Sequence, residues 1–178
     1  MTDEQRKFTV VGLDLSLTGS GIAYRDGTTG TVKTKQKDGD GRLAQIEEAV
    51  QIAVGGEGLG PVVDLVVMED IPQNSYAAKP IAMVHGVVRN LLVKAGVSYA
   101  LVVPATLKFY ATGKGSGDKV PMALAAYKRA GREFEDDNAC DAAWLRWAGL
   151  DWLGCPEFSM PAAQREALKK AVWPGVAR

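Results

Sequence analysis

Residues 8–25 read FTVVGLDLSLTGSGIAYR: an apolar, β-branched run, a turn of Gly, Ser and Thr, and a second short run. Because such runs between turn residues are typical of strands, we predict a strand over 8–13 and its hairpin partner over 21–25. Asp14 stands where the first strand should end. A carboxylate buried there is costly unless a positive group pairs with it, and a divalent cation is a common partner.

A second carboxylate follows a similar run further along the chain. Residues 62–68 are almost continuously apolar, and Glu69 comes directly after them, before Pro72 prevents the strand from continuing. The pattern then predicts a long helix over 77–95 and another strand over 98–103. A strand, helix, strand order of this length implies a right-handed crossover between parallel strands, so Glu69 should end a central strand.

The remaining pattern completes an α/β domain. We predict a third strand over 29–35, beside the first hairpin. Helical spacing, caps and turn residues predict further helices over 43–53, 104–111, 118–129, 137–147 and 159–172. The result is a mixed five-stranded sheet flanked by helices, and this order of elements matches the ribonuclease H-like fold.

Length and composition allow one domain of ordinary size, since the chain has 178 residues and no low-complexity tract. The N-terminus is polar, and no apolar run approaches the roughly 18 to 20 residues that span a membrane. We therefore expect a cytoplasmic protein without a membrane segment. Cys140 and Cys155 lack the paired spacing of metal ligands, and we interpret Cys140 as a buried free thiol.

Net charge is zero, but the charges are unevenly distributed. Residues 108–132 hold six basic residues and one acid, whereas residues 133–141 hold five acids and no base. A basic segment beside an acidic pocket suits a polyanion that is first held and then cut with the help of a metal. A solvated helix face followed by an acidic loop explains the same pattern equally well.

Four acids have positions that suit a shared metal site. Asp14 and Glu69 would meet at one edge if the first and fourth strands are neighbours, and Asp137 and Asp141 would share one helix face with Asn138 beside them. Such acids repel one another unless Mg²⁺ or Mn²⁺ lies among them. Each also has a structural alternative, because Asp14 could cap a turn, Glu69 could pair with a lysine and Asp137 could cap its own helix.

Four motifs in order resemble RuvC-type Holliday-junction resolvases, within which a phage-encoded branch is one option. They are GLDLSLTGSG, VVMED, the pattern P-x-x-x-K-x-x-x-x-G-x-G-x-x-x-K and an acidic helix ending in D-A, and they cover about residues 10–150. The resemblance implies a metal-dependent endodeoxyribonuclease that resolves four-way DNA junctions and leaves 5′-phosphate and 3′-hydroxyl ends. Residues 1–154 would form its ribonuclease H-like nuclease domain, and residues 155–178 a helical C-terminal extension that is not a separate domain.

Carried across position by position, the resemblance implies catalytic metal ligands at Asp14, Glu69 and Asp141. They would hold two Mg²⁺ ions, for which Mn²⁺ could substitute. The family often has Asp or His three residues before the final Asp, where this chain has Asn138, preceded by Asp137. Asn can offer a carbonyl oxygen but cannot act as a base, so Asn138 and Asp137 both remain candidates for the fourth oxygen.

The same resemblance implies contacts with branched DNA. Lys108 and Lys119 match its junction-contacting lysines, and Lys114 lies between them in the basic segment. The family can insert a residue into the junction shortly after the second motif, and Tyr76 is the aromatic candidate here. A tyrosine at a helix start also often packs against its own domain.

The family acts as a homodimer, and isologous dimers are the commonest assemblies. We expect the helix over 77–95 to supply the interface, because Met83, Val87 and Leu92 leave a second apolar stripe. His85 lies among apolar residues of that helix, and we interpret it as a packing residue.

Two other readings compete with a junction resolvase. Another nuclease of the same fold would cut flaps, other branched DNA or RNA–DNA hybrids. A junction-binding protein that no longer cuts is the non-enzymatic reading, motivated by Asn138. The first motif also resembles a phosphate loop of actin-like ATPases, but the chain is too short for their second domain.

Overall fold

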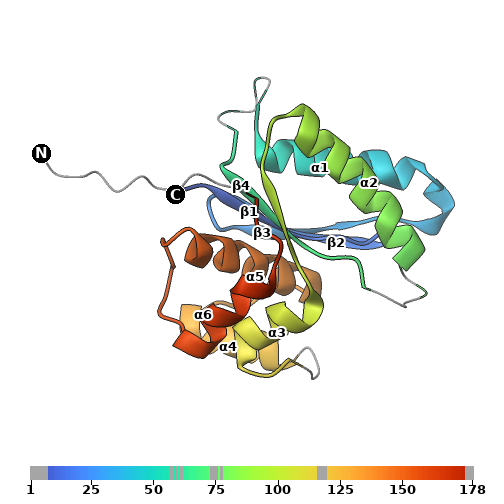
Figure 1. Cartoon of the computed structure of the whole chain (residues 1–178). Coiled ribbons are helices and arrows are strands. Elements are labelled where there is room, and N and C mark those ends of the chain that lie inside the picture. Colours follow the sequence, from blue (N-terminus) through green and yellow to red (C-terminus); the bar gives the residue numbers. More distant parts are fainter. Residues whose placement is uncertain are drawn as a thin grey trace, which may run out of the picture.

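A mixed five-stranded sheet lies between two layers of helices in the computed structural model (Figure 1). The structure describes residues 8–56, 58, 60, 62–72, 76, 78–115 and 120–174. The strand order is β3-β2-β1-β4-β5, with β1 antiparallel to β2 and parallel to β4. The strands are β1 (Val10–Asp14), β2 (Gly19–Ala23), β3 (Thr29–Lys33), β4 (Leu65–Glu69) and β5 (Tyr99–Val102). The predicted mixed five-stranded sheet is thus confirmed, and its first and fourth strands are neighbours.

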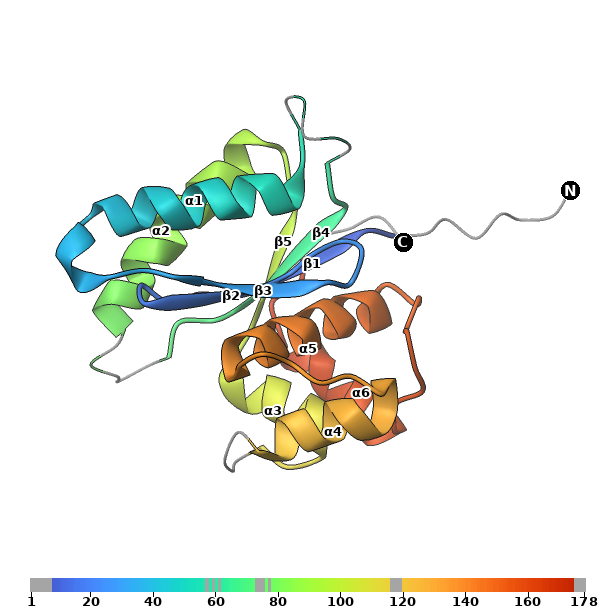
Figure 2. The same cartoon turned by 180° about the vertical axis from the view of Figure 1, so that it is seen from behind.

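The helices divide between the two faces of the sheet, as Figures 1 and 2 show. Helices α1 (Gly41–Val54) and α2 (Ala78–Lys94) cover one face. The opposite face carries α5 against the strands, with three further helices packed beyond it. The helix against the strands is α5 (Asp137–Trp152), and the three beyond it are α3 (Pro104–Thr112), α4 (Val120–Ala130) and α6 (Ala162–Ala167). Two short 3₁₀ helices complete the chain, η1 (Gln36–Asp38) and η2 (Leu168–Lys170).

Alternating side chains along the central strands divide the core into two parts. Val10 packs in the core beside α5, whereas Leu13 and its parallel partner Met68 pack in the core beside α1 and α2. Successive side chains of a strand point to opposite faces. Asp14 follows Leu13 and Glu69 follows Met68, so both carboxylates leave their strands on the α5 face.

Helix α5 lies unusually close to β1 and β2 because two strand positions are glycine. A Cβ added at Gly12 would lie 2.0 Å from the carbonyl oxygen of Ala142, and one added at Gly21 would lie 2.0 Å from that of Asn138. Both neighbours are helix backbone, which no side-chain rotation can move. The two glycines therefore set the distance between α5 and the sheet.

Three expectations about the helices are wrong. Helix α5 extends to Trp152, beyond the predicted end at 147, because its buried polar residues find partners in the following segment. The predicted helix over 159–172 shortens to α6 and η2, and Val172 instead exchanges backbone hydrogen bonds with Leu101 at the sheet edge. Leu92, placed in the exposed stripe of α2, is fully buried in the core.

Candidate active site

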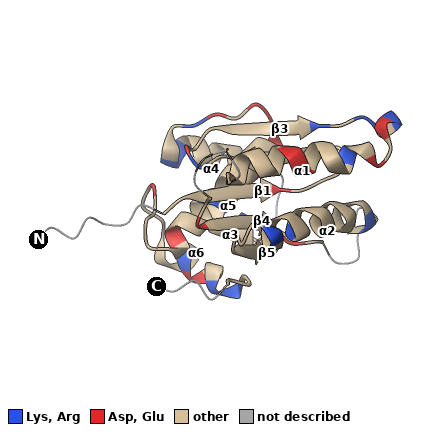
Figure 3. Ribbon diagram, turned by 90° about the horizontal axis from the view of Figure 1, so that it is seen from above, with Lys and Arg blue, Asp and Glu red and all other residues tan. Residues whose placement is uncertain are grey.

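The carboxyl ends of β1 and β4 bring two acidic residues to one edge of the sheet. Leu13 pairs with Met68 in the parallel ladder, so the next residues, Asp14 and Glu69, end neighbouring strands. Both side chains are half-buried and lie on the α5 face. Figure 3 shows the acidic end of β1 at this edge.

The N-terminal turn of α5 faces the same edge. Gly21 lies opposite Asp14 in the hairpin, and the backbone of Asn138 packs directly over Gly21. The side-chain amide nitrogen of Asn138 would lie 3.0 Å from a Cβ placed at Gly19. Asn138 is therefore positioned across the β1–β2 hairpin from Asp14.

Asp141 and Asp137 differ in their surroundings although both belong to this end of α5. Asp141 is half-buried and precedes Ala142, whose carbonyl packs against Gly12 of β1. Asp137 is exposed. The structure thus brings Asp141 and Asn138 toward the edge that carries Asp14, and leaves Asp137 at the surface.

The N-cap of α5 is Asp136, so the alternative in which Asp137 caps its own helix is wrong. The Asp136 carboxylate accepts hydrogen bonds from the Ala139 backbone N–H at 3.1 Å and from the Thr31 hydroxyl at 2.7 Å. Its other oxygen lies 3.2 Å from Lys33 Nζ. Burial alone would raise the pKa of Asp136, but these hydrogen bonds and the lysine outweigh it and lower the pKa. Asp136 therefore ties the first turn of α5 to β3.

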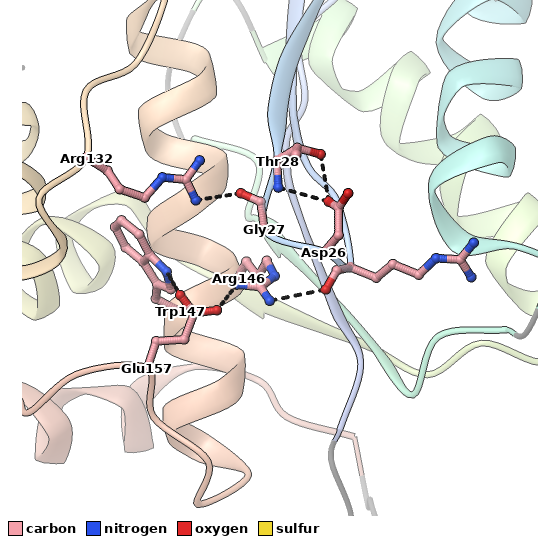
Figure 4. Close-up of polar contacts among 8 residues, drawn as sticks. Asp26, Gly27, Thr28, Arg132, Arg146, Trp147 and Glu157 are labelled. Carbon is pink, nitrogen blue, oxygen red and sulfur yellow. Dashed lines mark hydrogen bonds and ion pairs between the residues drawn. The ribbon is translucent and has the colours of Figure 1, made fainter.

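A second polar cluster fixes the middle of α5 against the turn between β2 and β3 (Figure 4). The buried Arg146 guanidinium pairs with Glu157 and donates to the Arg25 carbonyl at 3.2 Å. Trp147 Nε1 donates to the other Glu157 oxygen at 2.7 Å. Arg132, just before α5, donates to the Gly27 carbonyl at 2.5 Å. The β2–β3 turn is thereby attached to α5 by arginine hydrogen bonds.

The chemistry of the acidic edge can be tested against a metal. The residues at this edge would coordinate a cation through oxygen atoms, as hard cations such as Mg²⁺ and Mn²⁺ prefer. They are Asp14, Glu69, Asp141 and Asn138. Within the described ranges, however, no three His, Cys, Asp or Glu side chains are grouped closely enough to hold a metal ion. The three carboxylates each interact with another group of the protein. By donor type these residues suit Mg²⁺, but the described side chains are not gathered around one point in this structure.

His85 lies beneath the end of β4 and was interpreted from the sequence only as a packing residue. It is buried, with 2% of its surface exposed. Burial and the charge of Arg89 lower the pKa of His85 to about 4, against the opposing effects of Asp70 and of a hydrogen bond with the Glu69 backbone. His85 is therefore neutral at physiological pH. It packs against the end of β4, beside the backbone of Glu69. In the sequence, the four-residue spacing of His85 and Arg89 on the predicted helix is the feature that indicates a positive charge beside the histidine.

Of the expected DNA-contacting residues that the structure describes, Lys108 and Lys114 lie on or near α3. Lys108 is half-buried, one turn into a helix that begins just after β5, whose Val102 pairs with Glu69. Lys114 is exposed after the end of this helix, and Tyr76 is fully exposed. Lys119 lies outside the described residues.

In shape, the chain is similar to RuvC. A Thermus thermophilus RuvC structure matches it with a TM-score of 0.63 and 21% sequence identity, covering 86% of this chain and all of that one. A T. thermophilus RuvC in complex with a Holliday junction substrate matches with a TM-score of 0.64 and 20% identity, over 87% of this chain and 100% of the other. The chain has the ribonuclease H-like fold of RuvC.

The likeness to RuvC is one of fold. No protein-family model and no curated protein sequence matches the chain. The matches nevertheless cover each RuvC structure along its full length. As a separate observation, none of the helices in the described ranges is long and apolar enough to cross a membrane.

Proposed function

We propose that the protein is a metal-dependent, structure-selective endonuclease that resolves four-way DNA junctions and leaves 5′-phosphate and 3′-hydroxyl ends. The observation that carries this proposal is the placement of Asp14 and Glu69 on the α5 face of adjacent strand ends, opposite the first turn of α5. A RuvC of the same fold is known in complex with a Holliday junction. The junction is therefore the substrate that we propose first.

Each residue at the edge has a proposed role. Asp14, Glu69 and Asp141 would hold two Mg²⁺ ions, which when bound supply an activated water and stabilise the leaving oxygen. Asn138 is the better candidate for the additional oxygen, because it is half-buried against β2 whereas Asp137 is exposed. The amide can orient a ligand or water but cannot accept the proton of the attacking water.

The DNA contacts and the assembly belong to the same proposal. Lys108, Lys114 and Lys119 would neutralise phosphates of the branched DNA, and Tyr76 would stack at the branch. A homodimer would place one site against each of the two symmetric strands. Met83 and Val93 on α2 are exposed by 46% and 69% and would belong to the apolar surface of such a dimer. A monomer mass by light scattering at micromolar concentration would contradict this assembly.

The deciding experiment compares cleavage of a four-way junction, a flap, an RNA–DNA hybrid and a linear duplex in Mg²⁺. We expect the junction to be cut fastest, and Asp14→Asn and Glu69→Gln to abolish cutting while leaving junction binding intact. Faster cutting of flaps or hybrids would favour the other nucleases of this fold. Junction binding by the wild type without any cutting would favour a non-cutting binding protein.

A crystal soaked in Mn²⁺ tests the metal site independently of activity. We expect anomalous density shared by Asp14, Glu69 and Asp141, with Asn138 completing the shell. Density bound only by Asp137, or none at this edge, would contradict the assigned ligands.

A further inference from the structure

A basic groove lies between the C-terminal part of α3 and helix α4, apart from the acidic edge. It encloses about 590 Å³, and three of the described residues that line it are cationic while none is acidic. The cations are Lys114, Lys128 and Arg129, and Pro121 and Leu124 form an apolar wall beside them. We call these five residues the α3–α4 groove.

Among the described residues, no acidic side chain lines the groove beside its positive charges. Within the part of the chain that the structure describes, neither Lys114 nor Lys128 makes an ion pair, and both are exposed. The Arg129 guanidinium donates only to neutral acceptors, the Ser159 carbonyl at 3.4 Å and Gln164 Oε1 at 3.3 Å. Three like charges around one hollow repel one another, so an anion bound there would lower the electrostatic energy.

The groove is also held in shape by a buried side chain. Gln164 of α6 is 5% exposed, and its amide donates to the backbone carbonyls of Tyr110 at 2.6 Å and Phe109 at 3.4 Å. Its oxygen accepts from Arg129. One side chain thus fixes the C-terminal part of α3 and the arginine of α4 together. A preformed arrangement of donors loses less entropy on binding than a flexible one.

We infer that the α3–α4 groove binds the phosphodiester backbone of a duplex DNA arm, away from the phosphate that is cut. The choice of DNA as the polyanion rests on the proposed function. Helices α3 and α4 lie on the same side of the sheet as α5 (Figure 2), the side on which Asp14 and Glu69 leave their strands. A duplex held at that edge can therefore continue along this side of the molecule. Backbone contacts of this kind position a duplex without reading its sequence.

The test is the salt dependence of DNA binding by the full chain. Affinities for a linear duplex of about 20 base pairs and for a four-way junction are measured between about 50 and 200 mM KCl. For Lys114→Gln with Lys128→Gln, the slope of log affinity against log salt should become shallower by about 2, and affinity at low salt should fall by about tenfold or more. Arg129→Gln should remove about one further unit of slope.

Two variants separate a DNA-binding groove from a general loss of charge or fold. Lys94→Gln removes an exposed lysine from α2 on the opposite face of the sheet and should leave both slopes unchanged. Gln164→Leu keeps all three cations but releases Arg129, and should lower affinity less than the double lysine variant. Thermal unfolding should be unchanged for the lysine variants, since both side chains are exposed.

The outcomes distinguish this inference from the proposed function. Slopes that stay at the wild-type value in the double lysine variant would overturn the groove, even if the wild type cuts junctions. A shallower slope in a protein that binds DNA but cuts no junction would support the groove and contradict the proposed function. Equal effects of Lys94→Gln and the groove variants would also overturn the inference, because they would reflect net charge alone.

Discussion

Replacing Gly21 by alanine tests whether close packing of α5 positions the acidic edge. A Cβ at this position would lie 2.0 Å from the Asn138 carbonyl oxygen and 2.4 Å from its carbon. Ordinary contacts begin near 3.4 Å, so α5 or β2 must move by about 1 Å or more. The clashing atoms are backbone, and Gly12 holds the same helix equally closely one turn further along. The strain therefore cannot be relieved by a side chain.

The magnitude follows from this displacement. Overpacking a well-packed core typically costs about 1–3 kcal/mol, and we expect the free energy of unfolding to fall by that amount. Misplacing catalytic groups by about 1 Å can lower a rate about 100-fold. Asn138 and Asp141 move with α5 while Asp14 and Glu69 stay with the sheet. Single-turnover junction cleavage should therefore fall by about 100-fold or more, beyond what the lost stability explains.

Gly30→Ala is the matched control in the neighbouring strand. Its added Cβ would meet only the Tyr24 ring, at 3.9 Å, which is an ordinary contact. We expect both stability and cleavage to remain near the wild-type values. Urea unfolding and cleavage at a temperature where both variants are folded give the two readouts. A Gly21→Ala protein that cuts at the wild-type rate would refute the reasoning.

Three further predictions concern other residues. Glu157→Ala leaves the buried Arg146 without its ion partner and should lower the free energy of unfolding by about 3 kcal/mol in urea; a loss below about 1 kcal/mol would show that the pair contributes little. Asn138→Leu should reduce the rate of cleavage by about 10–100-fold, while Asp137→Asn should change it little. A larger loss of cleavage in Asp137→Asn than in Asn138→Leu would indicate that Asp137 supplies the fourth oxygen. Burial first, and then the Asp151 carboxylate, raise the pKa of Tyr110, so the folded protein keeps a proton that the unfolded chain loses above about pH 10. Wild-type stability should thus fall more steeply than that of Tyr110→Phe as the pH rises above 10, and parallel curves would contradict this.

The strands that carry the site could be predicted because their signals are local. β-branched runs end at Asp14 and at Glu69, and the strand, helix, strand order predicts the parallel pairing of the fourth and fifth strands. That the first and fourth strands are neighbours rests on the match of the element order to the ribonuclease H-like fold, and the structure has them as parallel neighbours. The positions of these two carboxylates therefore follow from short stretches of sequence. The helix beginning near Asp137 was also predictable, since its Cys140 belongs to an apolar pattern and is buried in the structure.

What could not be predicted depends on contacts between distant segments. Asp136 and Asp137 are equally good caps by type, and only Thr31 and Lys33 on β3 select Asp136. The end of α5 was missed because Asp151 is buried against Tyr110 and Arg165, partners that no local pattern reveals. The glycines of β1 and β2 looked like turn or strand residues, yet their function is to admit α5. Each of these features needs the tertiary structure to become visible.

Two kinds of contact hold α5, and they should affect activity differently. The polar contacts of Asp136 and Arg146 attach the helix to the β2–β3 hairpin, whereas Gly12 and Gly21 set its depth above the sheet. Losing a polar contact lowers the free energy of unfolding but leaves no atom in the way of the native position. Glu157→Ala should therefore lower stability more than Gly21→Ala while retaining nearly full cleavage in the folded state. If Glu157→Ala instead loses cleavage as severely as Gly21→Ala, then the arginine cluster, and not the glycine packing, determines where the first turn of α5 meets Asp14.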